Sequence, residues 1–261
     1  MIALEAKSIN VCYGKKIIIK NLDFKVKKGD VVTIVGPNGS GKSTLIKALS
    51  RLIKITSGDV ELYGKDIYKF NTKTIAKEMA ILPQIRNINT DVTVENLVSY
   101  GRQPHLKFGK RIGKDDEEII EWAMKKTRIY NLKDRSVSTL SGGERQRAWI
   151  SMALAQKPSI LILDEPTTFL DISYQLEVLE IVKELNKSLN ITVVMVLHDL
   201  NQAIRYSDKI YVLKQGEVYN FGKPNEVMTL SLIKKVFSID ANIYQDGINH
   251  CQYIIPQKLC D

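Results

Sequence analysis

The sequence predicts an α/β fold with a mostly parallel core sheet, and three observations indicate it. First, residues 31–35 are a continuous β-branched run and residues 160–163 a continuous apolar run, and such runs are typical of strands buried on both faces of a sheet. Second, a glycine-rich loop at residues 36–41 directly follows the first run, and a helix-like segment follows the loop. Third, the pattern between the two runs includes a long, mostly helical block that continues to about Leu140.

The flanking segments can be assigned in order along the chain. Residues 2–30 favour short strands joined by turns, and residues 22–26 alternate apolar with polar side chains, as a half-buried strand does. The helical block begins near Val94. Residues 141–156 predict a further helix, which Pro158 ends.

The later segments show the same mixture of helices and strands. They are, in order, a helix with one apolar stripe at 176–189, a buried strand at 191–197, a hairpin at 210–221, a short helix at 230–237 and a last strand at 253–255. The sequence contains neither a repeat nor a low-complexity linker. We therefore expect one domain with an inserted helical subdomain.

Composition narrows the class of protein. The 261 residues contain no apolar run of about 18 residues that could span a membrane, and the start lacks the pattern of a signal peptide, so a cytosolic chain is expected. The net charge of +9 is spread among acidic residues, so we expect no nucleic-acid partner. Cys12, Cys251 and Cys260 have no metal-site spacing, and unpaired thiols are favoured over a late redox pair of Cys251 with Cys260.

The glycine-rich loop carries the first chemical motif. Gly-Pro-Asn-Gly-Ser-Gly-Lys-Ser-Thr fits the P-loop pattern, in which backbone N–H groups point at phosphate oxygens. The lysine reaches the β- and γ-phosphates, and the following serine offers its hydroxyl to Mg²⁺. The residues predicted to bind the nucleotide here are Gly36, Asn38, Gly39, Ser40, Gly41, Lys42, Ser43 and Thr44.

Two other motifs place charge and hydrogen-bond donors at the ends of predicted elements. Asp164 and Glu165 close a buried strand at its carboxyl end, where ligands of open α/β sheets bind. One carboxylate can hold Mg²⁺ through water, and the other can act as a general base. Ser141, Gly142 and Gly143 open a helix with a hydroxyl and exposed N–H groups, which predicts a second anion site.

In this order, residues 36–44, 140–144 and 160–165 resemble the motifs of the ATP-binding cassette (ABC) ATPases, and the resemblance covers nearly the whole chain. It implies a P-loop NTPase fold of the ABC ATPase type, with an N-terminal antiparallel β subdomain and an inserted α-helical subdomain. ATP and Mg²⁺ are implied with it. The implied organisation is a single ABC ATPase domain over residues 1–261, with its core at about 1–84 and 156–261 and its helical subdomain at about 90–155.

The resemblance also implies roles for single residues. Asp164 takes the metal role and Glu165 the general-base role. His198 resembles the switch histidine that hydrogen-bonds the γ-phosphate, although a lone histidine after a strand is more often structural. Gln84 stands where the Q-loop glutamine joins the Mg²⁺–water shell, a weak signal without its context. Tyr13 resembles the aromatic residue that stacks on adenine, and an ordinary strand tyrosine is its alternative.

A head-to-tail homodimer is implied as well. In the family, Ser141, Gly142 and Gly143 contact the γ-phosphate held by the opposite protomer, so two copies sandwich two ATP molecules. Asp171 resembles the D-loop aspartate that links the two sites, and residues 85–91 are expected to face the membrane partner. The family most often has Ser or Asn at the position of Thr168, so the fine coupling of the sites is in question there.

Three further strings, at residues 101–105, 147–156 and 165–172, look like those of ATPases from importers for ferric siderophores, haem and vitamin B12. They imply an importer subunit at the cytoplasmic face of the cell membrane. Its partners would be two transmembrane permease subunits and, indirectly, an extracytoplasmic substrate-binding protein. Another importer type of shared ancestry is one alternative, and the single-cassette iron–sulfur cluster assembly ATPase is another. A P-loop kinase would leave Ser141 and its glycines unexplained.

Overall fold

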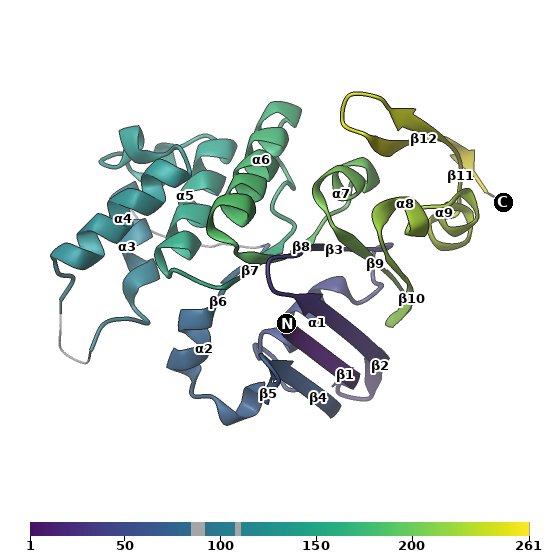
Figure 1. Cartoon of the computed structure of the whole chain (residues 1–261), viewed down its shortest axis with the longest axis horizontal. Coiled ribbons are helices and arrows are strands. Elements are labelled where there is room, and N and C mark those ends of the chain that lie inside the picture. The colour runs from purple at the N-terminus through teal and green to yellow at the C-terminus, as the bar shows by residue number, and fades with distance from the viewer. Residues whose placement is uncertain (85–91, 108–110, 261) are drawn as a thin grey trace. The chain divides into compact units, whose positions relative to one another are not determined.

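The computed structural model describes residues 1–84, 92–107 and 111–260, and the chain divides into two compact units. Unit 1 comprises Met1–Lys69 and Val194–Asp261, and unit 2 comprises Phe70–Val193. Figure 1 shows the elements in chain order by colour. Within the described residues, no helix combines the length and the apolar character that a membrane span requires.

Unit 1 contains the predicted N-terminal antiparallel sheet. Its strands are β1 (Ile2–Tyr13), β2 (Lys16–Lys27), β4 (Ser57–Leu62) and β5 (Lys65–Asp66), in the order β2-β1-β4-β5. All three pairs are antiparallel. The alternation predicted for residues 22–26 is observed, because Leu22, Phe24 and Val26 are buried while the residues between them are exposed.

The parallel part of unit 1 positions the glycine-rich loop. Strand β3 (Val31–Val35) is buried along its whole length and pairs in parallel with β9 (Lys209–Lys214). Strand β10 (Glu217–Gly222) returns antiparallel to β9 through Gln215 and Gly216, whose φ values of 52° and 86° suit a tight hairpin turn. The predicted hairpin is therefore confirmed.

The remaining elements of unit 1 are mostly short. They are η1 (Ile67–Lys69), α1 (Lys42–Leu49), α7 (Leu200–Tyr206), α8 (Pro224–Val227), α9 (Leu230–Phe237), β11 (Ile239–Asp246) and β12 (Cys251–Leu259). Strands β11 and β12 form a two-stranded antiparallel sheet of their own. The prediction of a single last strand was incomplete, since the polar residues of β11 hide its strand pattern.

Unit 2 is mostly helical, with a short parallel strand pair. Its elements are α2 (Thr72–Glu78), β6 (Met79–Leu82), α3 (Val94–Ser99), η2 (Tyr100–Arg102), α4 (Lys114–Lys126), η3 (Tyr130–Leu132), η4 (Val137–Thr139), α5 (Gly142–Ala155), β7 (Ile160–Asp164) and α6 (Ile172–Leu189). Strands β6 and β7 pair in parallel. Strand β8 (Thr192–Val196), which is buried throughout, begins in unit 2 and ends in unit 1.

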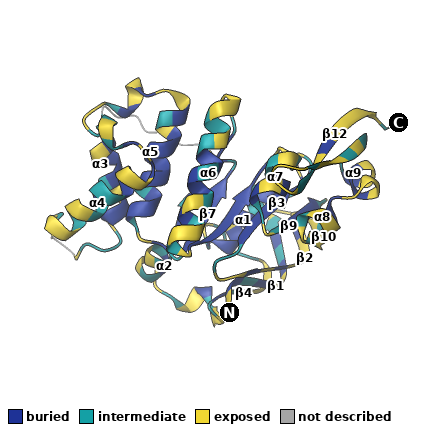
Figure 2. Ribbon diagram, turned by 45° about the horizontal axis from the view of Figure 1, so that its top comes forward, coloured by how far each residue is buried: buried dark blue, intermediate teal, exposed yellow. Residues whose placement is uncertain are grey.

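Helix α5 has a largely buried body and exposed residues at its N-terminal end. Most of its residues from Gln146 onward are buried (Figure 2). By contrast, Ser141 and Gly142 are exposed. Helices α3, α4 and α6 pack against it within unit 2. Parallel core strands, an antiparallel N-terminal sheet and a helical block together confirm the predicted α/β fold class. The predicted boundaries of the helical subdomain stay a prediction.

Candidate functional site

In unit 1, the glycine-rich loop joins the end of β3 to the start of α1 in a conformation that requires glycine. Gly36, Gly39 and Gly41 have φ values of 154°, 77° and 100°, all in the region that side chains disfavour. A Cβ on Gly36 would also lie 2.2 Å from the carbonyl oxygen of Leu213. Gly41 is the N-cap of α1 and provides no side-chain cap, so the start of this helix can accept an anion.

The polar side chains of the loop fit a phosphate group. Lys42 is 6% exposed, and its Nζ donates hydrogen bonds to the carbonyl oxygens of Gly36 at 2.8 Å and Pro37 at 3.0 Å. The Oγ of Ser40 is buried and makes no hydrogen bond within the part of the chain that the structure describes. A buried ammonium and an unsatisfied hydroxyl beside a helix start are groups that phosphate oxygens can satisfy.

Unit 2 brings together a second set of predicted residues around Glu165. Asp164 ends β7 and is 4% exposed, while Glu165 follows with a left-handed φ of 54°. The Glu165 carboxylate accepts a hydrogen bond from the side-chain amide of Gln84 and another, at 3.2 Å, from Thr168 Oγ1. In the sequence, Thr168 is only a departure from the commonest family pattern, and this contact gives its hydroxyl a partner.

The start of α5 is a complete capping box. Ser141 Oγ accepts from the Glu144 backbone N–H at 3.3 Å, and the Glu144 carboxylate accepts from the Ser141 N–H at 2.9 Å. The hydrogen bond that the Ser141 backbone N–H donates to the Glu144 carboxylate is the largest cause that lowers the pKa of Glu144. A Cβ on Gly143 would lie 2.3 Å from Tyr174 Cδ1, so this glycine is needed for packing against α6 as well.

An exposed apolar pair, which the sequence did not reveal, lies beside Asp171. Asp171 is the exposed N-cap of α6 and makes no capping bond through its side chain. Phe169 is 96% exposed and Ile172 is 76% exposed. A partner that covers side chains of this size stabilises the complex by about 25 cal/mol per Å² of apolar surface removed from water. Their exposure becomes visible only with the structure, because the sequence shows them as ordinary apolar residues.

The other two predicted residues lie in unit 1. His198 follows β8 and is exposed, and the next residue, Asp199, caps α7 by accepting from the N–H groups of Asn201 at 2.7 Å and Gln202 at 2.9 Å. This cap fixes the backbone beside His198. Tyr13 ends β1 and is 51% exposed.

The predicted site residues thus form one set in each unit. Unit 1 contains Tyr13, His198 and the loop at 36–44, and unit 2 contains Gln84, Asp164, Glu165, Ser141, Gly142, Gly143 and Asp171. The predicted membrane-facing segment at 85–91 lies outside the described residues. Within the described ranges, no group of three or more His, Cys, Asp or Glu side chains could hold a metal ion.

Comparison with known proteins connects these features to a family. The model of the family described as ABC transporter matches residues 19–168. The iron(3+)-hydroxamate import ATP-binding protein FhuC of Bacillus subtilis is 46% identical over 246 residues, which cover 94% of this chain and 91% of that protein. The ferric enterobactin transport ATP-binding protein FepC of Escherichia coli is 42% identical over 97% of this chain and 93% of its own.

Solved structures with a similar fold come from the same family. A transporter assigned to the metal-chelate ABC type, in an inward-facing conformation, matches with a TM-score of 0.87 and 25% identity over 99% of this chain and 98% of that one. The ATP-binding cassette MJ0796, in a dimeric post-hydrolysis state bound to ADP and Pi, matches with a TM-score of 0.73 and 30% identity over 85% of this chain and 98% of that one. Domains of this kind bind and hydrolyse ATP. The chain, with its P-loop and its carboxylates at the end of β7, belongs to the ATPases of the ABC transporter family.

Proposed function

We propose that this chain hydrolyses ATP to energise the uptake of an iron chelate or vitamin B12 through a membrane permease. The observation that carries the proposal is its 42–46% identity, over more than 90% of its length, to ATP-binding proteins named for hydroxamate, petrobactin and enterobactin import. The chain would work at the cytoplasmic face of the membrane, against two permease subunits. An extracytoplasmic binding protein would deliver the substrate to that permease.

In the proposed chemistry, unit 1 holds the nucleotide. The N–H groups of the loop, Lys42 and the start of α1 bind the phosphates, and Tyr13 stacks on the adenine. The loop's glycine conformations and the buried ammonium support this assignment. The hydroxyl of Ser43 belongs to the same set and would contact Mg²⁺. His198 would hydrogen-bond the γ-phosphate and orient the attacking water.

The residues of unit 2 suit a magnesium ion held mainly by oxygen ligands. Mg²⁺ retains several waters and takes only one or two protein carboxylates besides phosphate oxygens, so a lone buried carboxylate is sufficient. Asp164, at the end of β7, has this character, with Gln84 as a further ligand through its amide oxygen. When bound, Mg²⁺ neutralises charge on the β- and γ-phosphates.

Glu165 would act as the general base. Its carboxylate would take the proton of a water whose oxygen attacks the γ-phosphorus, while the bond to the β–γ bridging oxygen breaks and ADP leaves. The hydrogen bonds from Gln84 and Thr168 fix the orientation of the carboxylate that takes the proton. Both donors meet the same carboxylate oxygen, Oε2.

The second anion site, at the start of α5, would serve another copy of the chain. Ser141 and Gly142 are exposed there, and the exposed apolar pair at Phe169 and Ile172 offers surface for a partner to cover. We assign the γ-phosphate of ATP bound to the second copy as the ligand of Ser141, Gly142 and Gly143. Asp171, on the same exposed stretch, would cross this interface, and two copies would enclose two ATP molecules.

Uptake and co-purification together test the proposal. Deletion of the gene in its own host should abolish uptake of radioactive iron supplied as a ferric siderophore or haem, or of labelled vitamin B12. The unaltered gene should restore that uptake, whereas a Glu165→Gln copy should not. The tagged chain should co-purify with a polytopic membrane protein. Normal uptake of all these compounds together with capture of soluble iron–sulfur scaffold proteins would instead support the assembly ATPase and refute the importer.

A further inference from the structure

Residues 101–105, Gly-Arg-Gln-Pro-His, take no part in the proposed chemistry, yet the structure sets them against the C-terminal end of α5. Gly101 lies in η2, and a Cβ there would come within 2.1 Å of the carbonyl oxygen of Met152 in α5. A contact this short leaves no room for any side chain. The backbone of η2 can therefore approach α5 so closely only with glycine at this position.

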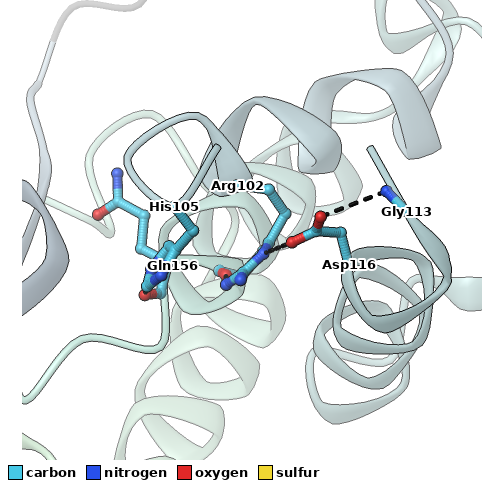
Figure 3. A network of polar contacts seen from close by, with 6 residues as sticks. Arg102, His105, Gly113, Asp116 and Gln156 are labelled. Atoms are coloured by element: carbon cyan, nitrogen blue, oxygen red, sulfur yellow. Dashed lines mark hydrogen bonds and ion pairs between the residues drawn. The ribbon is translucent and has the colours of Figure 1, made fainter. Parts of the chain in front are cut away.

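Arg102 is the centre of the contact. It is 5% exposed, its Nη1 donates to the carbonyl oxygen of Ala155 at 2.7 Å, and its Nε donates to Asp116 Oδ1 at 2.8 Å (Figure 3). The other carboxylate oxygen of Asp116 accepts from the N–H of Gly113 at 3.3 Å, at the start of α4. One guanidinium thereby joins the first turn of α4 to the last turn of α5.

His105 completes the arrangement. Its Nε2 lies 2.8 Å from the carbonyl oxygen of Gln156, the C-cap of α5. Because a carbonyl oxygen only accepts, Nε2 must carry the proton in this contact. The last four carbonyl groups of a helix have no partner inside it, and here Arg102 and His105 satisfy two of them. The positive charge of Arg102 also favours a helix C-terminus.

The two ends of α5 thus have different partners. The N-terminal end presents Ser141 and Gly142 at the surface, and the C-terminal end is held by Arg102 and His105. Building on the function proposed above, we propose that Arg102 and His105 are positioning residues for ATP hydrolysis. They hold the C-terminal end of α5 so that the capping box at Ser141 meets the γ-phosphate bound to the second copy.

Because α5 is long, a small rotation at its C-terminal end produces a large displacement of its N-terminal end. The 14 residues of α5 span roughly 20 Å at 1.5 Å per residue. A rotation of about 3° around the held end would therefore move the Ser141 end by about 1 Å, and a displacement of that size can cost about 100-fold in rate. We call the contacts of Arg102 and His105 with the C-terminal end of α5 the clamp. Loss of the clamp should reduce turnover and leave the residues that bind ATP in unit 1 unchanged.

Conservative variants separate positioning from folding. Arg102→Lys keeps the charge, but a lysine ammonium cannot reproduce the planar fork that reaches Ala155 and Asp116 together. His105→Phe keeps a ring and removes the donor, whereas His105→Gln returns an amide N–H near the position of Nε2. Arg128→Met is the matched control, because it removes an exposed pair with Glu184 at 2.6 Å in the same unit.

Each variant is purified as the full chain and assayed for melting temperature, affinity for ATP, kcat and KM. A second set, in the Glu165→Gln background, is assayed for ATP-dependent dimers by light scattering. Arg102→Lys and His105→Phe should lower kcat by about tenfold to 100-fold and reduce the dimer fraction, with ATP affinity unchanged. His105→Gln should recover most of the kcat lost in His105→Phe, and Arg128→Met should behave as the parental chain.

Two results would overturn the clamp. One is a folded Arg102→Lys or His105→Phe chain with parental kcat and dimer fraction. The other is a loss of kcat that Arg128→Met shares, or that a weaker affinity for ATP fully accounts for. If the parental chain itself neither hydrolyses ATP nor dimerises with ATP in the Glu165→Gln form, the proposed function fails and the clamp proposal falls with it.

Discussion

Replacement of Glu165 by glutamine is the sharpest test of the proposed chemistry, because it replaces one carboxylate oxygen by an amide NH₂ group and preserves the shape of the side chain. The Glu165 carboxylate accepts hydrogen bonds from the Gln84 amide and from Thr168 Oγ1 at 3.2 Å. A glutamine side chain has the same length and retains one acceptor oxygen, which Thr168 can still reach. What disappears is the negative charge and the ability to take a proton from water.

The expected magnitude follows from that loss. A positioned general base contributes about 10²- to 10⁴-fold to a rate, so kcat should fall by that factor, equivalent to about 3–5 kcal/mol at 1.36 kcal/mol per tenfold. The P-loop residues belong to unit 1 and Glu165 to unit 2. Nucleotide affinity should not weaken, because every P-loop residue proposed to bind the phosphates is unchanged and the substitution removes a negative charge. The unhydrolysed ATP should hold two copies together.

Phosphate release under saturating ATP measures the loss, and light scattering with and without ATP measures the dimer. Glu184→Gln is the control, because this exposed glutamate in α6 pairs only with Arg128 among the ion pairs described. Thr168→Val should give an intermediate result, a decrease of about tenfold or less, since it removes one hydrogen bond of about 1 kcal/mol. Parental turnover in Glu165→Gln would show that another group takes the proton.

Three further predictions concern α5. Ser141→Arg should leave ATP affinity near the parental value while abolishing ATP-dependent dimers and hydrolysis, and dimers that persist would contradict the second anion site. Gly143→Ala should destabilise the chain by about 1–3 kcal/mol in urea unfolding, because its Cβ would meet Tyr174 Cδ1 at 2.3 Å, and a smaller residue at Tyr174 should relieve this. Burial lowers the pKa of His105, and the positive charges of Arg102 and Lys77 lower it further against the bond to the Gln156 carbonyl. As the pH falls, the histidine of the unfolded chain, with its ordinary pKa, binds a proton before His105 of the folded chain does. The free energy of unfolding should therefore decrease as the pH drops below about 6.5, and it should decrease less steeply in His105→Gln.

The sequence was sufficient for features that depend on neighbouring residues. An unbroken β-branched run at Val31–Val35 predicts a strand buried on both faces, because no polar face is available for water. Gln215 and Gly216 between two apolar runs predict a hairpin for a similarly local reason, since the turn needs positive φ values. The P-loop belongs to this class too, because the eight consecutive residues 36–43 carry its whole pattern.

Features that depend on distant residues could not be predicted in this way. Arg102 donates to Ala155, which is 53 positions away, and Gly101 is constrained by Met152 in the same helix. In the sequence alone, these residues indicate only a resemblance to the ATPases of importers. Gly143 was similarly predicted to serve an anion, whereas its contact with Tyr174 shows that packing alone would also require glycine there. Such pairings are set by helix packing, which single-chain patterns do not encode.

These contacts change the meaning of the sequence motifs around α5. The Ser141 motif and the string at 101–105 are separated in the chain, and only the first looks chemical. In the structure they hold opposite ends of one helix, each through a glycine that allows close approach, Gly143 against Tyr174 and Gly101 against the Met152 carbonyl. A helix fixed in this manner moves as one body, because a packed interior adjusts little to displaced neighbours. The position of the proposed anion site would consequently depend on both ends of α5, on Tyr174 close to it and, at the far end, on Arg102 and His105, which never meet ATP.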